Sequence, residues 1–149
     1  MYCSATDIKR LISEATLLQL CDDDNVGAIV ESPSNTAYLN IVAAIEQADA
    51  LINTYIGGRY TVPVTLDPLP QILRDASGNL AVCNLFDRRR EMDVPEGVER
   101  RRKSILQLLK DIAAGTAEIA ELSTSASVAI HTNKTAADRM FTDTLLNTF

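Results

Sequence analysis

An acidic stretch near the N-terminus carries the residue types best suited to bind a cation. It opens with three consecutive aspartates, Asp22, Asp23 and Asp24. Together with the following Gly27, their order resembles the beginning of an EF-hand calcium loop. Val26 takes the place of a side-chain ligand, however, and Pro33 takes the place of the bidentate glutamate that closes such a loop. We therefore predict a solvated acidic loop and no metal site.

Residues that could carry out catalysis are scarce. The single histidine, His131, has no serine and aspartate around it in the arrangement that a catalytic triad requires. No glycine-rich phosphate-binding motif occurs. The three cysteines, Cys3, Cys21 and Cys83, are too far apart in the sequence to suggest a zinc site, and we expect them to be reduced and to pack as small hydrophobes. No enzymatic activity and no cofactor are predicted.

Two basic clusters lie at the end of one predicted helix and near the start of the next. They include Arg88, Arg89, Arg101 and Arg102. Consecutive residues of a helix point in different directions, so part of each cluster must face solvent or a partner. One interpretation is ordinary pairing on a helix surface, for instance between Glu99 and Lys103. The other is pairing with the acidic face of a neighbouring copy, which would make head-to-tail rings plausible.

The net charge of −6 is concentrated in the first third of the chain. Residues 1–50 hold eight acidic residues against two basic ones, whereas residues 101–149 hold five against six. This balance disfavours sequence-specific DNA binding, because affinity for nucleic acid comes largely from neutralising phosphates. No apolar run approaches the roughly 18 residues of a membrane span, and residues 1–10 lack a signal-peptide pattern. We expect a soluble cytosolic protein.

The composition and periodicity predict an all-α fold, a small bundle of about four to five helices. Aromatic residues make up only 5% of the chain and tryptophan is absent, which suits helix packing better than a sandwich or barrel. A first helix is predicted after Ser4 or Thr6 and a second at Ser13, unless the two form one kinked helix. Three longer helices are predicted over residues 37–56, 70–90 and 95–114.

The helix predicted over residues 37–56 has the clearest apolar face. That face comprises Leu39, Val42, Ile45, Ala48, Ile52 and Tyr55. Gly57 and Gly58 are expected to end the helix. The three prolines of residues 59–70 predict an extended connection to the next helix. Gly78, inside that next helix, lowers helix stability and indicates a close helix crossing.

An extended arm over residues 116–149 is predicted to follow the helical domain of residues 1–115. Its first part is rich in threonine, serine and alanine, and such a segment cannot offset its own ordering entropy. The β-branched residues around 128–132 suggest a short β element that adds to a partner. An apolar hook follows, with predicted interface residues Arg139, Phe141, Leu145, Leu146 and Phe149. The arm is expected to order against another protein, which favours an assembly protein.

The order of several short motifs resembles that of a known family. The chain opens with YCSATDI at residues 2–8, and IGGRYTVPV at residues 56–64 follows the long predicted helix. LFDRR at residues 85–89, a helix end at Gly115 and a hook beginning at Arg139 complete the order. Over nearly its whole length the chain is therefore similar to the head–tail connector proteins of Mu-like phages and prophages.

The resemblance implies a structural protein of the virion neck. Such adaptors form a ring, expected to be a dodecamer, on the portal vertex, which they reach in the host cytoplasm during assembly. The ring extends the DNA channel, through which DNA passes without sequence-specific binding, and provides a docking surface for the stopper or tail-completion protein. No membrane is involved.

The resemblance also suggests where the candidate residues act. The acidic loop would face the channel or a partner, and the apolar hook would fill pockets on an adjacent copy or on the portal. A second class stays open, namely a small helical regulatory or protein-interaction module. Such a module would remain a monomer or dimer and bind a protein or DNA ligand, whereas an assembly protein would form concentration-dependent oligomers.

Overall fold

Six α-helices form over residues 1–123, the part of the chain that the computed structural model describes. They are α1 (Ala5–Leu11), α2 (Glu14–Cys21), α3 (Thr36–Ile56), α4 (Gln71–Arg88), α5 (Glu96–Ala114) and α6 (Ala120–Ser123). No strand occurs within these residues, and the predicted all-α fold class is confirmed. The β element predicted in the arm lies outside the described residues.

Local sequence signals determine where the helices begin and end. Ser4 and Asp7 form a reciprocal capping box at the start of α1, and the Ser13 side chain caps α2. Between these helices Ile12 is extended, with φ −134° and ψ 156°, so the chain forms two short helices and not one kinked helix. Gly115 ends α5 with a φ of 84°, a left-handed conformation that glycine adopts without a Cβ clash.

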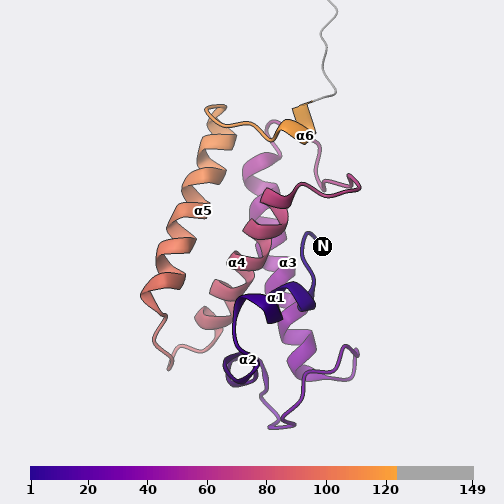
Figure 1. The fold of residues 1–149 in the computed structure, drawn as a ribbon, viewed down its shortest axis with the longest axis vertical. Coiled ribbons are helices and arrows are strands. Elements are labelled where there is room, and N and C mark those ends of the chain that lie inside the picture. The colour runs from indigo at the N-terminus through magenta and orange to yellow at the C-terminus, as the bar shows by residue number, and fades with distance from the viewer. Residues whose placement is uncertain (124–149) are drawn as a thin grey trace, which may run out of the picture.

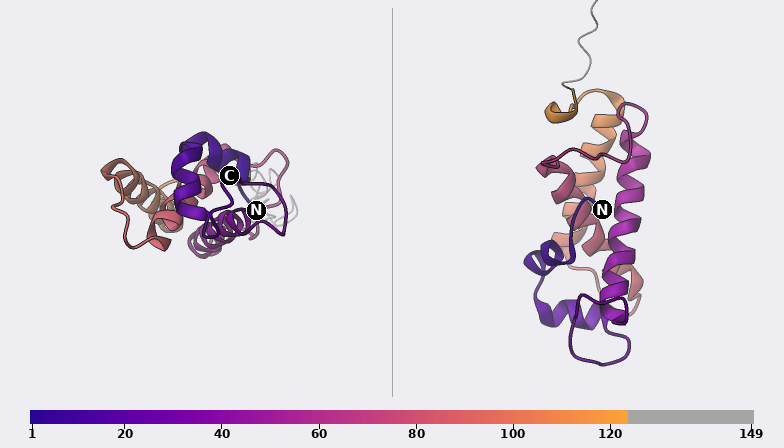
Figure 2. Two further views of the ribbon diagram at one scale, coloured as in Figure 1. Left: turned by 90° about the horizontal axis from the view of Figure 1, so that it is seen from below. Right: turned by 90° about the vertical axis from the view of Figure 1, so that its right-hand side faces the viewer.

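The three long helices run side by side and form the body of the molecule (Figure 1). α4 contacts α3 most extensively and also packs against α5, while α1 packs across α4. α2 packs against α3 and α4 near one end of the bundle, and α6 lies at the other end (Figure 2). The acidic loop that follows α2 and the chain segment that follows α5 therefore lie at opposite ends of the bundle.

The core is built chiefly on α4, which has ten buried residues. Gly78 is one of them, and a Cβ atom built there would lie 3.1 Å from Cδ1 of Leu11 in α1. Gly78 therefore lies where α1 packs on α4, and its close neighbour is a side-chain atom, so the predicted close helix crossing stays a prediction. All three cysteines are buried and free, as predicted, and pack as small hydrophobic residues.

The buried face of α3 differs in part from the predicted one. Leu39 is 46% exposed, and its assignment to the core was wrong. Ile45, Ala48 and Ile52 are buried as predicted. The face also includes residues that were not predicted, namely Ala37, Ile41, Ala44, Asp49 and Ile56. α3 is covered by α2, α4 and α5 together, so its buried face is wider than one apolar stripe and lies to one side of Leu39.

The chain remains packed on the bundle beyond Gly115. Ile119 is 1% exposed, and the short helix α6, which was not predicted, follows it. The folded unit thus extends past the predicted boundary at residue 115, because the apolar side chain of Ile119 is buried against the bundle. The predicted hook residues lie outside the described residues, namely Arg139, Phe141, Leu145, Leu146 and Phe149.

Candidate functional site

The structure brings together the acidic loop and the first basic cluster. One carboxylate oxygen of Asp23 pairs with Arg88, and the other lies 2.7 Å from Nη2 of Arg89. Arg88 also donates to the carbonyl oxygen of Leu20 at 2.8 Å, and Asn40 donates to the Asp23 carboxylate at 3.2 Å. These contacts tie the loop to α2, α3 and the end of α4 within one copy. Pairing of the two arginines with a neighbouring copy stays a prediction.

The side chain of Asp22 closes the acidic loop through hydrogen bonds with the backbone of the loop itself. Its carboxylate accepts hydrogen bonds from the N–H groups of Gly27 at 2.7 Å and Val26 at 3.1 Å. The hydrogen bond from Gly27 is the main reason why the pKa of Asp22 is lowered from its usual value. Asn25 and Gly27 both have a positive φ, which lets the chain turn tightly around this carboxylate. Asp24 is exposed on the loop.

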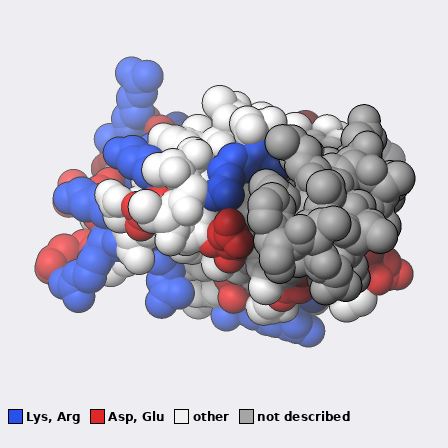
Figure 3. Space-filling model, turned by 90° about the horizontal axis from the view of Figure 1, so that it is seen from above, with Lys and Arg blue, Asp and Glu red and all other residues white. Residues whose placement is uncertain are grey.

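The second basic cluster is only partly neutralised within the chain. Nη1 of Arg102 lies 2.7 Å from the carboxylate of Asp87, which joins α5 to the end of α4. Arg100 pairs with Glu96 one turn earlier on α5. Arg101 is exposed and has no ion pair within residues 1–123. Figure 3 shows basic side chains projecting on the side of the molecule where α5 lies, with acidic side chains between them.

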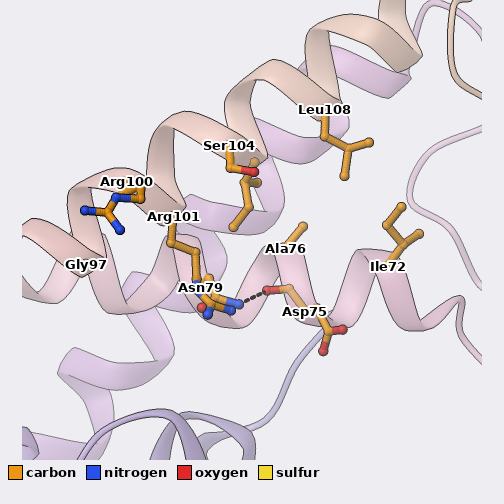
Figure 4. Close-up of a pocket in the computed structure, with 10 residues that line it drawn as sticks. Ile72, Asp75, Ala76, Asn79, Gly97, Arg100, Arg101, Ser104 and Leu108 are labelled. Atoms are coloured by element: carbon orange, nitrogen blue, oxygen red, sulfur yellow. Dashed lines mark hydrogen bonds between the residues drawn. The ribbon is translucent and has the colours of Figure 1, made fainter.

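A groove between α4 and α5 was not predicted from the sequence (Figure 4). It has a volume of about 580 Å³. Its apolar lining consists of Ile72, Ala76, Ile105 and Leu108. Figure 4 shows Ile72 and Leu108 at one end, and Arg100 and Arg101 at the other. Ile72 remains 36% exposed in this groove.

The groove continues towards α1. A second hollow of about 380 Å³ shares Asn79, Gly97 and Arg101 with the first. Leu11 and Ile12, at the end of α1, line this second hollow, and Leu11 is 44% exposed. Partly exposed apolar side chains of α1, α4 and α5 therefore lie along one continuous depression. The sequence offered a weak signal for it, since Gly97 and Ala76 leave space where larger residues would fill the seam.

The IGGRYTVPV motif holds the end of α5 and the start of α6. Nη1 of Arg59 donates to the carbonyl oxygen of Ile112 at 3.2 Å, and Nη2 lies 3.2 Å from the carboxylate of Glu118. The hydroxyl of Tyr60 accepts a hydrogen bond from the N–H of Ile119 at 3.1 Å. These two side chains thus hold the end of α5 and residues 118–119 in place on the bundle.

Asp49 is a buried carboxylate that sequence reasoning missed. It accepts hydrogen bonds from the N–H of Tyr2 at 2.8 Å and from the hydroxyl of Ser77 at 2.6 Å. The hydroxyl of Tyr2 accepts a hydrogen bond from Val64, and burial is the main cause that raises the pKa of Tyr2. The YCSATDI motif is therefore anchored inside the fold. Asp49 lies three residues before Ile52, and residues with this spacing share one face of a helix. The spacing was therefore the sequence signal that Asp49 is buried with Ile52 on α3.

Residues 1–123 present apolar and charged surfaces that another molecule could contact. Within residues 1–123, no group of three or more histidine, cysteine, aspartate or glutamate side chains is placed to hold a metal ion. None of the helices in the same range has an apolar stretch long enough to cross a bilayer. His131 lies outside the described residues. The groove, the acidic loop and the unpaired Arg101 are consequently the candidate contact surfaces of the bundle.

Comparison with known proteins identifies the family. Residues 2–137 match the protein family described as "Bacteriophage Mu, Gp36". The match includes the whole bundle and the motifs at residues 2–8, 56–64 and 85–89. No curated protein matches the sequence. The predicted resemblance to proteins of Mu-like phages is confirmed, and the chain belongs to the bacteriophage Mu Gp36 family.

Proposed function

We propose that this protein is a head–tail connector of a Mu-like phage. The observation that carries the proposal is the family match over residues 2–137, which makes the chain a phage protein. The motif order, which resembles that of connector proteins, supports the specific role. The protein would form a ring, expected to be a dodecamer, on the portal vertex, in the neck of the virion. It is proposed as a structural protein without enzymatic activity.

The shape of the subunit supports a position between two partners. The acidic loop lies at one end of the bundle, and residues 115–119, held by Arg59 and Tyr60, lie at the other end (Figure 1). A subunit with different surfaces at its two ends can bind the portal at one end and a stopper or tail-completion protein at the other. Ring closure additionally needs two different side surfaces that fit each other on neighbouring copies.

The charge distribution supports a DNA channel without specific binding. The chain has a net charge of −6, and Asp24 is exposed on the acidic loop. Negative charge facing the lumen would repel DNA phosphates and let the DNA pass without adhering. Asp22 and Asp23 shape and anchor the loop that presents Asp24, since their carboxylates are hydrogen-bonded within the chain.

Mixing the purified protein with its portal tests the proposal. Light scattering after size exclusion should show a complex that contains several copies for each portal ring, and negative-stain microscopy should show an added ring on the portal. A protein that remains a monomer or dimer, and leaves the portal unchanged, would contradict the proposal. That result would favour the alternative, a small helical regulatory or protein-interaction module, which would then be sought by its protein or DNA ligand.

A further inference from the structure

The groove between α4 and α5 has the properties of a docking surface. Its floor is apolar, formed by Ala76 and Ile105, and partly exposed Ile72 and Leu108 border one end. At its other end Arg101 is exposed without an ion pair inside the described part of the chain. Such a surface suits an amphipathic segment with apolar side chains on one face and an acidic residue about two turns away.

We propose that this groove binds residues 138–149 of a second copy of the same chain. This inference rests on the proposed function, because a ring needs a contact between neighbouring copies. In the sequence of the segment, Asp138, Phe141 and Leu145 are spaced at i, i+3 and i+7, which would place them on one face of a helix. Phe149 follows four residues after Leu145 and continues the same face.

The spacing of charge and apolar groups is the same on the two sides of the proposed contact. Arg101 and Leu108 are seven positions apart on α5, and Asp138 and Leu145 are seven positions apart in the segment. On a helix both intervals correspond to about 10 Å. Asp138 can therefore pair with Arg101 while Leu145 contacts Leu108, with the segment parallel to α5 in the groove.

The connecting chain is long enough to reach another copy. Residues 124–137 lie between α6 and the segment, and an extended chain of this length spans at most about 50 Å. α5, with 19 residues, is only about 28 Å long. A segment that starts at the α6 end of one bundle can thus extend past the length of that bundle to the groove of its neighbour.

A labelled peptide of residues 136–149 tests the contact directly by fluorescence anisotropy. The acceptor is the full chain with Phe141→Ser, Leu145→Ser and Phe149→Ser, so that its own segment does not compete. Saturable binding is expected. Adding Leu108→Glu to the acceptor should weaken the binding at least about tenfold, equivalent to about 1.4 kcal/mol. Leu51→Glu, at a 37% exposed position of α3 outside the groove, is the matched control and should leave binding unchanged.

A charge exchange tests the register of the segment. Arg101→Asp in the acceptor should weaken binding of the natural peptide several-fold, and a peptide carrying Asp138→Arg should restore it to within about twofold. If Arg101→Asp weakened binding only because it unfolded the acceptor, the peptide with Asp138→Arg would not restore the binding. Binding that is absent, or that is insensitive to Leu108→Glu, would overturn the inference.

The unaltered full chain shows whether the segment docks in the groove of a second copy or in the groove of its own chain. When this chain is labelled, kept well below the dissociation constant of the peptide complex and titrated with unlabelled peptide, it should bind the peptide as tightly as the chain with the altered segment does, because its own segment does not occupy its own groove. Much weaker binding would show docking within one chain and would overturn the inference. Rings on the portal without peptide binding would refute this contact alone, and peptide binding without rings would refute the connector role alone.

Discussion

Arg59 donates a hydrogen bond at 3.2 Å to the carbonyl oxygen of Ile112, which lies 53 residues further along the chain. The same carbonyl oxygen accepts a hydrogen bond from the N–H of Gly115 at 3.2 Å, so Arg59 adds a second donor at the end of α5. The same guanidinium pairs with Glu118 and lies close to Gly115. One side chain from the connection after α3 therefore stabilises both the end of the last long helix and the turn that follows it.

Replacing Arg59 should release this turn. We expect Arg59→Ala to lower the free energy of unfolding by about 1 kcal/mol, since the side chain is partly exposed and its charged hydrogen bonds are screened. Amide hydrogen exchange should rise at residues 116–122 while α4 remains protected. Arg100→Ala, which removes the exposed pair with Glu96, should cost only about 0.3 kcal/mol. Equal effects of the two substitutions would contradict the role assigned to Arg59.

Asp49 should be required for stability. Asp49→Ala leaves the buried N–H of Tyr2 without its acceptor and leaves the hydroxyl of Ser77 only the weaker acceptor Sγ of Cys3, and we expect a loss of about 3 kcal/mol in urea unfolding. Asp49→Asn keeps one acceptor oxygen and should cost less. Glu46→Ala, at an exposed position of the same helix, is the control and should change stability by less than about 0.5 kcal/mol.

The aspartates of the acidic loop should differ in their effect on stability. Asp23→Ala breaks the pairs with Arg88 and Arg89, and we expect a loss of about 1 kcal/mol that shrinks in 1 M salt. Asp24→Ala should leave stability nearly unchanged, because Asp24 is exposed on the loop. Thermal unfolding at low and high salt measures both. The proposed lumen-facing role predicts that Asp24→Ala leaves assembly on the portal unchanged, whereas impaired assembly would indicate that Asp24 contacts a partner.

Two glycines should respond to alanine in opposite directions. At Gly78 the added Cβ meets only the end of the partly exposed Leu11 side chain at 3.1 Å, which can move. Gly78→Ala should therefore stabilise the protein by about 0.5 kcal/mol, part of the helix-propensity gain. Gly115→Ala should destabilise it by about 1–2 kcal/mol, because φ is 84° and the Cβ would lie 2.9 Å from Nη1 of Arg59. Unfolding in urea, followed by circular dichroism, compares the two.

The buried thiols should make stability fall at alkaline pH. Burial raises the pKa of Cys21 and of Cys83 from 9.0 to about 11 in the folded protein. Between these values the unfolded chain loses both thiol protons while the folded chain keeps them, so stability is full below pH 9 and falls towards pH 11. A Cys21→Ala, Cys83→Ala variant should show a flatter decline in melting temperature. An identical decline in both proteins would contradict the assignment.

The helices were largely predictable because the signals that start and end them are local. Ser13 and Asn35 cap helices that begin at the next residue, and Gly115 ends α5 where its position in the sequence predicted. The exposure of Leu39 was not predictable from periodicity, because which side of α3 is covered depends on where α2, α4 and α5 pack. α6 has four residues, too few to show a periodic pattern.

The candidate contact surfaces were harder to predict. Asp23 and Arg88 were each recognised as candidate residues, but they lie 65 residues apart and the chain holds many other possible pairs of opposite charge. Tyr60 and Ile119 meet through a main-chain N–H, a group that every residue except proline carries, so the sequence contains no specific signal for the contact. The groove depends on the relative positions of α4 and α5 and follows only from the folded structure.

The hydrogen bond from the N–H of Ile119 to the hydroxyl of Tyr60 determines how a mechanical force applied to the C-terminal segment would reach the helical bundle. A pull on the C-terminal segment meets the hydroxyl of Tyr60 and the buried side chain of Ile119 before it reaches the end of α5. Tension on that segment would therefore be carried into the connection between α3 and α4, which lies at the same end of the bundle as α6. The last turn of α5 would bear this load only after the contact between Tyr60 and Ile119 had broken.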